Sequence, residues 1–203
     1  MPDPDPQIFR WMLLLVLVGN LVISGYHRAR ARADETIPRA AEPLGLRLVR
    51  VVFALPGMLL MLAFMIYPPW VAWSSMAVPV WARWAGVFLG LAVAPLNVWV
   101  LRSLGKNVSE TVLAKASHEL AHAGPYRWVR HPLYSSGFVM IGAVSLIAAN
   151  WLMGALTLGG IFLFLLVIIP REEAELVKKF GDRYREYRTR TGRLFPRFLP
   201  ARG

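Results

Sequence analysis

Long apolar stretches alternate with short polar segments along most of this 203-residue chain. A helix needs about 20 mostly apolar residues to cross the hydrocarbon core of a bilayer, and residues 8–26, 51–73 and 81–101 meet that length. Residues 132–170 carry no formal charge, and one helix over them would be about 58 Å long against about 30 Å of hydrocarbon. We therefore predict a tight helical hairpin that turns at the polar break Ala149-Asn150-Trp151.

The chain changes after this hairpin to a mixed apolar and basic pattern. Between Arg171 and Arg190, apolar and aromatic residues recur at helical spacing among lysines and arginines, at Leu176, Phe180, Tyr184 and Tyr187. This pattern predicts an amphipathic helix that lies at the membrane surface. The predicted fold is an all-α, polytopic membrane protein with about five transmembrane helices, a tight C-terminal hairpin and an amphipathic C-terminal helix. We divide it into a three-span region, residues 1–101, and a second region, residues 102–203.

Charge and composition support a membrane protein. The chain is 56% hydrophobic, and 23 Lys and Arg against 12 Asp and Glu give a net charge of +11. Because the basic residues fall between apolar segments, orientation in the bilayer and contact with anionic headgroups explain them better than binding to nucleic acid. Five spans with the C-terminus in the cytoplasm place all basic residues except Arg10 and Arg83 on the cytoplasmic side. The absence of cysteine excludes disulfides and thiolate metal sites.

Three polar groups flank the predicted hairpin. His118-Glu119-Leu120-Ala121 and the segment from Gly124 to Tyr134 precede it, and Arg171-Glu172-Glu173 follows it. Because the two helices of a hairpin are antiparallel, its open ends near Tyr134 and Pro170 must be neighbours. We therefore expect the three groups to meet in space. His118 and His122 have the spacing of metal ligands on a helix, but without cysteine or an obvious third ligand we predict no metal site.

Each group also has a simple structural explanation. Pro132 is suited to the first position of a helix, and Arg130 with His131 could mark the water interface. Glu172 and Glu173 after Pro170 could stabilise a helix start through the helix dipole. If all three explanations held, complementary charges would have come together at one point by chance. We therefore favour a functional site over three unrelated structural roles.

Taken together, these segments resemble the C-terminal half of the isoprenylcysteine carboxyl methyltransferase family over about residues 103–200. Membrane phospholipid N-methyltransferases share much of the pattern. The resemblance is carried by His118-x-Leu120, Gly124-Pro125-Tyr126, Arg130-His131-Pro132-x-Tyr134, Glu172-Glu173, Phe180-Gly181-x-x-Tyr184-x-x-Tyr187 and Pro196.

The resemblance implies an S-adenosylmethionine-dependent methyltransferase with a cytoplasm-facing pocket capped by the C-terminal helix. A lipid-like or prenylated substrate would enter from the bilayer, and its acceptor would be a carboxylate or a phospholipid amine. By matching position, cofactor contacts fall on His118, Glu119, Leu120, Ala121, Tyr126, His131, Pro132, Leu133, Tyr134, Glu172 and Glu173.

One position departs from the family. The arginine that meets the substrate in the prenylcysteine enzymes corresponds to Ile168, so we expect Arg171 or Arg130 to take a catalytic role in docking an anionic substrate. The excess of arginine over lysine suggests a bacterial host, which places the chain in a bacterial cytoplasmic membrane. The oligomeric state does not follow from the sequence.

Two other functions share some of these features. Sterol and steroid reductases, which use NADPH, also contain Arg-His-Pro-x-Tyr beside a membrane hairpin. They would carry an acidic residue after the next glycine, whereas here Phe138 follows Gly137. The third possibility is a non-enzymatic membrane protein whose basic tail binds anionic lipid.

Overall fold

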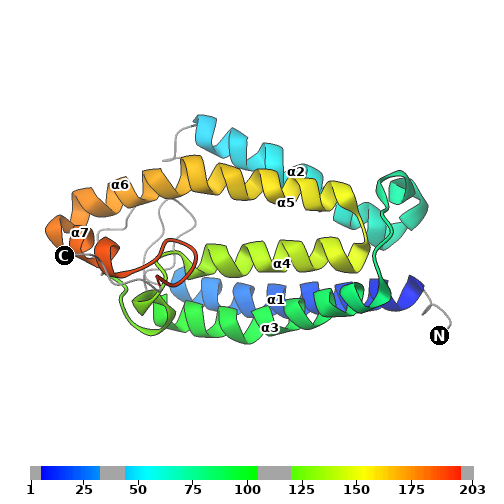
Figure 1. Cartoon of the computed structure of the whole chain (residues 1–203), viewed down its shortest axis with the longest axis horizontal. Helices are drawn as coiled ribbons and strands as arrows, with labels where there is room; N and C mark the ends of the chain where they lie inside the picture. Colours follow the sequence, from blue (N-terminus) through cyan, green and yellow to red (C-terminus); the bar gives the residue numbers. More distant parts are fainter. Residues whose placement is uncertain (1–5, 33–43, 105–119, 198–203) are drawn as a thin grey trace.

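The structure is a computed structural model that describes residues 6–32, 44–104 and 120–197. Within these ranges it contains helices and no strand of a sheet, which confirms the all-α prediction (Figure 1). The helices are α1 (Pro6–Arg32), α2 (Leu44–Ile66), α3 (Val80–Leu104), α4 (Pro132–Ala148), α5 (Trp151–Leu163), α6 (Ile169–Phe180) and α7 (Asp182–Arg190). Shorter turns of helix are η2 (Pro68–Ser74), η4 (Gly124–Arg127) and the π-helical η5 (Phe164–Ile168).

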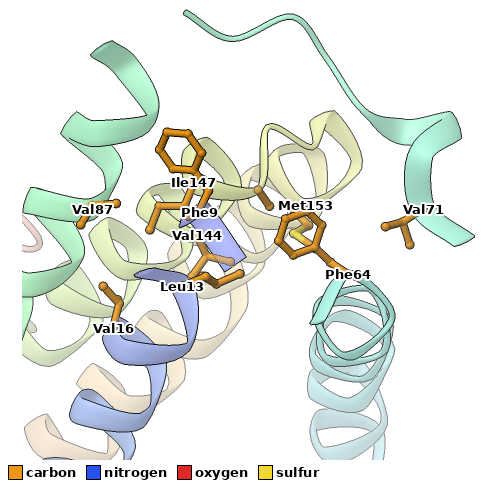
Figure 2. Packing of buried hydrophobic residues seen from close by; sticks show 10 residues of the cluster. Phe9, Leu13, Val16, Phe64, Val71, Val87, Val144, Ile147 and Met153 are labelled. Atoms are coloured by element: carbon orange, nitrogen blue, oxygen red, sulfur yellow. The ribbon is translucent and has the colours of Figure 1, made fainter. Parts of the chain in front are cut away.

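The helices pack as a bundle in which α4 is central. Helix α3 packs most extensively against α4 and also against α1, while α5 contacts α4 on one side and α2 on the other (Figure 1). The N-terminus of α1 and the α4–α5 turn lie at one end, and α7 lies at the opposite end. The core between the helices is apolar and includes Phe9, Leu13, Val87, Val144, Ile147 and Met153 (Figure 2).

Three helical stretches are long and apolar enough to cross a membrane, namely Gln7–His27, Val80–Leu104 and Trp151–Phe180. The apolar helices Ala54–Ile66 and Pro132–Ala148 are shorter. Many large apolar side chains on the outside of the bundle are exposed, including Leu21, Phe88 and Leu166, as expected for helices that face lipid. The chain is therefore an integral membrane protein, while five spans and their orientation stay predictions.

The predicted hairpin turn is confirmed. Helix α4 ends at Ala148, and the capping residue Ala149 adopts a left-handed conformation with φ 50°. Asn150 caps the start of α5 by accepting a hydrogen bond of 3.0 Å from the Met153 amide. Asn150 also donates to the Ser74 hydroxyl at 2.7 Å, which ties the turn to η2. Both side chains are buried, so the turn is fixed by a satisfied polar pair.

Replacing Asn150 with alanine is expected to lower the free energy of unfolding by about 1–2 kcal/mol, because the α5 cap is lost. Thermal or chemical unfolding of the purified protein in detergent measures this change. Ser75→Ala at an exposed serine beside the same turn is the control and should change stability by less than about 0.5 kcal/mol. Equal stability of the two variants would contradict the capping role.

The predicted boundary at Pro170, between the second helix of the hairpin and the amphipathic helix, is wrong. Helix α5 continues through η5 and Pro170 into α6, and the break comes at Gly181, where φ is +57°. Proline lacks an amide hydrogen and its ring would clash with the carbonyl four residues earlier in an ordinary α-helix. The preceding π-helical turn, in which the Ile169 amide bonds to the Phe164 carbonyl, accommodates this defect without ending the helix.

The second predicted span also has different bounds. Helix α2 begins at Leu44 instead of Val51 and ends at Ile66 instead of Trp73. Pro68 and Pro69 start η2, because two successive residues without an amide hydrogen cannot extend the helical ladder. The turn η2 thereby becomes free to pack on the hairpin turn.

Candidate active site

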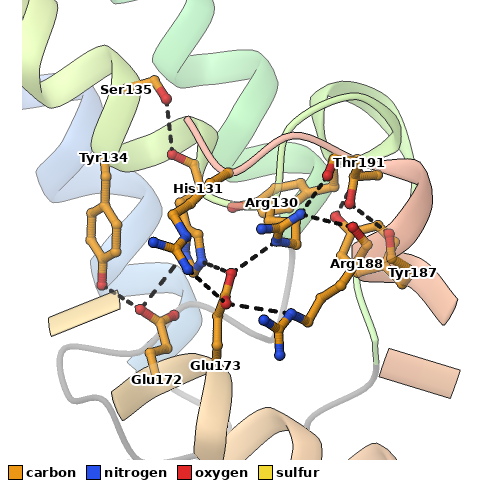
Figure 3. A network of polar contacts seen from close by, with 11 residues as sticks. Arg130, His131, Tyr134, Ser135, Glu172, Glu173, Tyr187, Arg188 and Thr191 are labelled. Atoms are coloured by element: carbon orange, nitrogen blue, oxygen red, sulfur yellow. Dashed lines mark hydrogen bonds and ion pairs between the residues drawn. The ribbon is translucent and has the colours of Figure 1, made fainter. Parts of the chain in front are cut away.

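The open end of the hairpin brings two of the three predicted polar groups together, while His118 and Glu119 of the third group lie outside the described residues. The Tyr134 hydroxyl, in the first turn of α4, donates to Glu172 Oε2 of α6 at 2.7 Å. Just before α4, His131 Nε2 lies 3.4 Å from Glu173 Oε1 and Nδ1 lies 3.8 Å from Glu172 Oε2 (Figure 3). The antiparallel hairpin therefore places an imidazole and a phenol against two carboxylates some 40 residues away in sequence.

Aromatic rings form one wall of this site. The His131 and Tyr134 rings are stacked, with centroids 5.5 Å apart and an interplanar angle of 8°. Phe164 meets the Tyr134 ring edge-on at 4.9 Å and the Phe138 ring at 5.6 Å. Sequence reasoning missed Phe164, because its direction depends on the π-helical turn. Pro170 after the long apolar run indicated a helix boundary or a kink, and not a π-helical turn.

Glu172 is the more accessible of the two carboxylates. Its side chain is 27% exposed, and its contacts to Tyr134 and His131 both involve Oε2. Among the described residues, no hydrogen bond reaches Oε1. A partly exposed carboxylate with one oxygen unused can accept hydrogen bonds from an ammonium or from hydroxyl groups of a ligand.

Glu173 is in a different environment although it is the next residue. Its side chain is 3% exposed, and Arg130 Nε donates to its Oε1 at 2.8 Å. Arg188 Nε and Arg193 Nη2 approach its Oε2 at 3.5 and 3.6 Å (Figure 3). With His131, four basic side chains surround this carboxylate, so its charge is compensated within the protein.

The segment after α7 runs back along the loop that precedes α4. The Arg130 amide donates to the Gly192 carbonyl at 2.8 Å and the His131 amide to the Arg193 carbonyl at 3.1 Å. The Gly192 amide donates to the Trp128 carbonyl, and the Ser135 hydroxyl donates to the Leu194 carbonyl at 2.6 Å. The residues that follow α7 are therefore part of the site, and no motif in the sequence pointed to a site role for Arg188 or Arg193.

Three buried or partly buried tyrosines, Tyr126, Tyr184 and Tyr187, lie near the loop that precedes α4. The Tyr187 hydroxyl donates to the Tyr126 carbonyl at 2.6 Å. Burial raises the pKa of Tyr187 to about 12, and burial likewise raises the pKa of Tyr126 and of Tyr184. These phenols therefore stay neutral at physiological pH, and Tyr187 acts as a hydrogen-bond donor.

The other predicted site residues are distributed around this centre. Pro132 is buried at the start of α4, and Leu133 packs against Leu101 of α3. Leu120 and Ala121 lie in the loop before η4 and are partly exposed, whereas His118 and Glu119 lie outside the described residues. Within the described ranges there is no group of three or more side chains suited to hold a metal ion.

The two arginines predicted to dock a substrate occupy different environments. Arg130 is 9% exposed, and its guanidinium bonds to Glu173 and to the carbonyls of Arg188 and Thr191. Arg171 is exposed on α6. Ile168, at the position where the family would carry an arginine, is fully buried. Between the two arginines, Arg171 is the one with an accessible side chain, and its role in docking stays a prediction.

Comparison with known proteins gives consistent similarities. The model of the isoprenylcysteine carboxyl methyltransferase (ICMT) family matches residues 86–178. The chain is 27% identical over 139 residues to the methanethiol S-methyltransferase of Mycobacterium tuberculosis, which covers 61% of this chain and 56% of that protein. It is 38% identical over 71 residues to methanethiol S-methyltransferase 1 of Bradyrhizobium diazoefficiens, which covers 35% of this chain and 24% of that protein.

The fold has a counterpart among solved structures. The structure of the eukaryotic intramembrane Ras methyltransferase ICMT matches with a TM-score of 0.57 and 18% identity, covering 100% of this chain and 71% of that one. At this identity the likeness concerns the fold alone. The matches to the two curated relatives span about half or less of those proteins. The region from within α3 to within α6 therefore resembles the ICMT family, and the chain as a whole has the fold of an ICMT-like membrane protein.

Proposed function

We propose that this protein is an S-adenosylmethionine-dependent integral membrane methyltransferase. The observation that carries the proposal is the Tyr134–Glu172 hydrogen bond across the open end of the hairpin, beside the stacked His131 ring. It joins two motifs of the matched region at one point, where a lipid-facing bundle meets its most polar segment. The region matched by the family model starts inside α3, so we assign this activity to residues 102–203 together with the end of α3.

The residues at this point fit the chemistry of the proposed cofactor. S-adenosylmethionine carries an ammonium group and ribose hydroxyls. A carboxylate oxygen such as Oε1 of Glu172 can accept hydrogen bonds from these groups. It also carries a sulfonium cation, which an aromatic face such as that of Tyr134 attracts. When bound, the cofactor would supply the methyl group. The protein's part would be to align donor and acceptor and to keep water away.

The proposed acceptor is a small apolar or lipid-like nucleophile that reaches the site from the bilayer. Two relatives are named as methyltransferases of methanethiol, and the similar solved structure is named as a methyltransferase of isoprenylcysteine. A carboxylate acceptor needs a cation to dock, and Arg171 is the accessible candidate near the buried Ile168. A thiol or an amine must instead lose a proton before it can attack the methyl group. We further propose that the site faces the cytoplasm of a bacterial cell.

Binding of S-adenosylhomocysteine tests the cofactor. We expect titration calorimetry of the purified protein in detergent to show saturable binding of S-adenosylhomocysteine, and no binding of NADPH under the same conditions. NADPH binding alone would support a membrane reductase. Binding of neither compound, together with binding to vesicles that contain anionic lipid, would support a non-enzymatic lipid-binding protein. Either of these two results would overturn the proposed function.

The acceptor can be identified in the same preparation. Labelled S-adenosylmethionine is incubated with the protein and, in separate reactions, with total membrane lipid, an alkyl thiol or a farnesylated cysteine derivative. If Arg171 docks a carboxylate, Arg171→Ala should lower turnover with the farnesylated cysteine and leave turnover with the thiol unchanged. Equal effects on both reactions would remove the docking role.

A further inference from the structure

The C-terminal segment, which we define as residues 182–194, is attached to the site through the buried carboxylate of Glu173 and a short ladder of backbone hydrogen bonds. Side-chain hydrogen bonds from Arg130, Ser135 and Tyr187 add to this attachment. The ladder joins Trp128, Arg130 and His131 to Gly192 and Arg193. Two of the four basic groups around Glu173, on Arg188 and Arg193, belong to this segment. The other two, on Arg130 and His131, belong to the loop before α4 (Figure 3).

The charges in this cluster are unevenly distributed. Arg130, Arg188 and Arg193 carry guanidinium groups, and the Glu173 carboxylate lies between all three. Without the carboxylate, these guanidinium groups would repel one another around a position where Arg130 is largely buried and Arg188 and Arg193 are partly exposed. The single negative charge of Glu173 therefore offsets the repulsion among these guanidinium groups where the C-terminal segment meets the loop.

We propose that Glu173 is a positioning residue that latches the C-terminal segment onto the site, and that it is not a ligand of the cofactor. Successive residues on a helix point about 100° apart, which explains how neighbouring carboxylates serve different purposes. Within the part of the chain that the structure describes, Glu172 has one oxygen without a hydrogen bond, whereas Glu173 uses both oxygens for basic side chains. The inference rests on the proposed function in one respect, because the ligand of the latched site is taken to be the cofactor.

Amide hydrogen exchange of the full-length protein in detergent tests the latch without any need for activity. We expect Glu173→Gln to speed exchange about tenfold in residues 128–131 and 182–194, while exchange in α3 and α4 stays within about twofold of the wild type. Glu173→Asp keeps the charge on a shorter side chain and should give an intermediate rate. The matched control is Glu175→Gln on the same helix, which removes only an exposed pair with Lys178 at 2.6 Å and should not change exchange in either region.

A second variant tests the latch independently, in case Glu173→Gln does not fold. Arg193→Gln removes a partner that is 39% exposed and leaves no buried charge unpaired, so it should fold and still loosen residues 182–194 at least threefold. In the wild type, S-adenosylhomocysteine should slow exchange of this segment, and the slowing should be weaker in both variants.

Three results would overturn the latch. The first is unchanged exchange in Glu173→Gln or in Arg193→Gln. The second is equally faster exchange throughout α3 and α4, which would make Glu173 a general stability residue. The third is lost binding of S-adenosylhomocysteine in Glu173→Gln with normal exchange, which would make Glu173 a ligand. If the wild type binds no S-adenosylhomocysteine, the proposed function fails, and the exchange rates of the variants still decide whether the latch exists.

Discussion

Replacing Glu172 with glutamine is expected to weaken binding of S-adenosylhomocysteine about 10- to 100-fold. Hydrogen bonds to a charged group contribute about 1.5–3 kcal/mol, and the substitution removes the charge while keeping the size of the side chain. Glu172 is the partly exposed carboxylate of the site, and its Oε2 already accepts the Tyr134 hydroxyl at 2.7 Å. The amide that replaces it cannot accept at both oxygens, so an ammonium or a pair of hydroxyls loses its partner.

Titration calorimetry measures this affinity, and circular dichroism checks that helix content is retained. Tyr134→Phe removes the hydroxyl that orients the carboxylate while keeping the ring, so it should weaken binding less than Glu172→Gln does. Glu175→Gln is the control for charge on the same helix and should bind like the wild type, because its carboxylate pairs with Lys178 at the surface. Wild-type affinity in Glu172→Gln would show that the ligand binds elsewhere.

Replacing Gly86 with valine is expected to lower the free energy of unfolding by about 2–3 kcal/mol. Helix α3 crosses α4 at this glycine with no room for a side chain. A Cβ atom there would lie 2.9 Å from Leu146 Cβ and 3.0 Å from the Ala143 carbonyl oxygen. Neither atom is the end of a flexible side chain, so the two helices would have to move apart. Small residues allow such close contact between helices in membranes.

Gly142→Val is the matched control for this prediction, because no atom lies within 4 Å of a Cβ at Gly142 in α4. It should change stability by less than about 0.5 kcal/mol in the same unfolding experiment in detergent. If both valine variants unfold at the same denaturant concentration, the contact between α3 and α4 is less close than the structure shows. Because α4 begins at the candidate site, we also expect Gly86→Val to weaken S-adenosylhomocysteine binding moderately.

The roles proposed for the two glutamates follow from one geometric difference. Glu172 is 27% exposed and contacts a phenol, while Glu173 is 3% exposed and contacts three guanidinium groups. Removing one partner of a buried ion pair is costly because the other charge stays behind unpaired. The same substitution at neighbouring positions is therefore expected to give a binding defect at Glu172 and a local opening of the C-terminal segment at Glu173.

The amino-acid sequence by itself determined the hairpin and the meeting of its ends. An uncharged run of 39 residues is too long for one span, and Asn150 is the polar break near its middle. Once the chain turns there, connectivity alone forces Tyr134 and His131 to lie near Glu172 and Glu173. These conclusions depend only on helix length and bilayer thickness, which are properties of local sequence.

Only the tertiary structure decided which of the two glutamates is accessible to a ligand and which is buried among basic side chains. The sequence favoured a helix start at Pro170, whereas a π-helical turn carries the helix through the proline and directs Phe164 toward Tyr134. It also grouped both glutamates as cofactor contacts and gave no partner for either. Which carboxylate is buried depends on the rotation of α6 and on Arg188 and Arg193, which return from a segment beyond the Gly181 break. Helix rotation and long-range ion pairing are set by packing between distant segments, and no local pattern of residues encodes them.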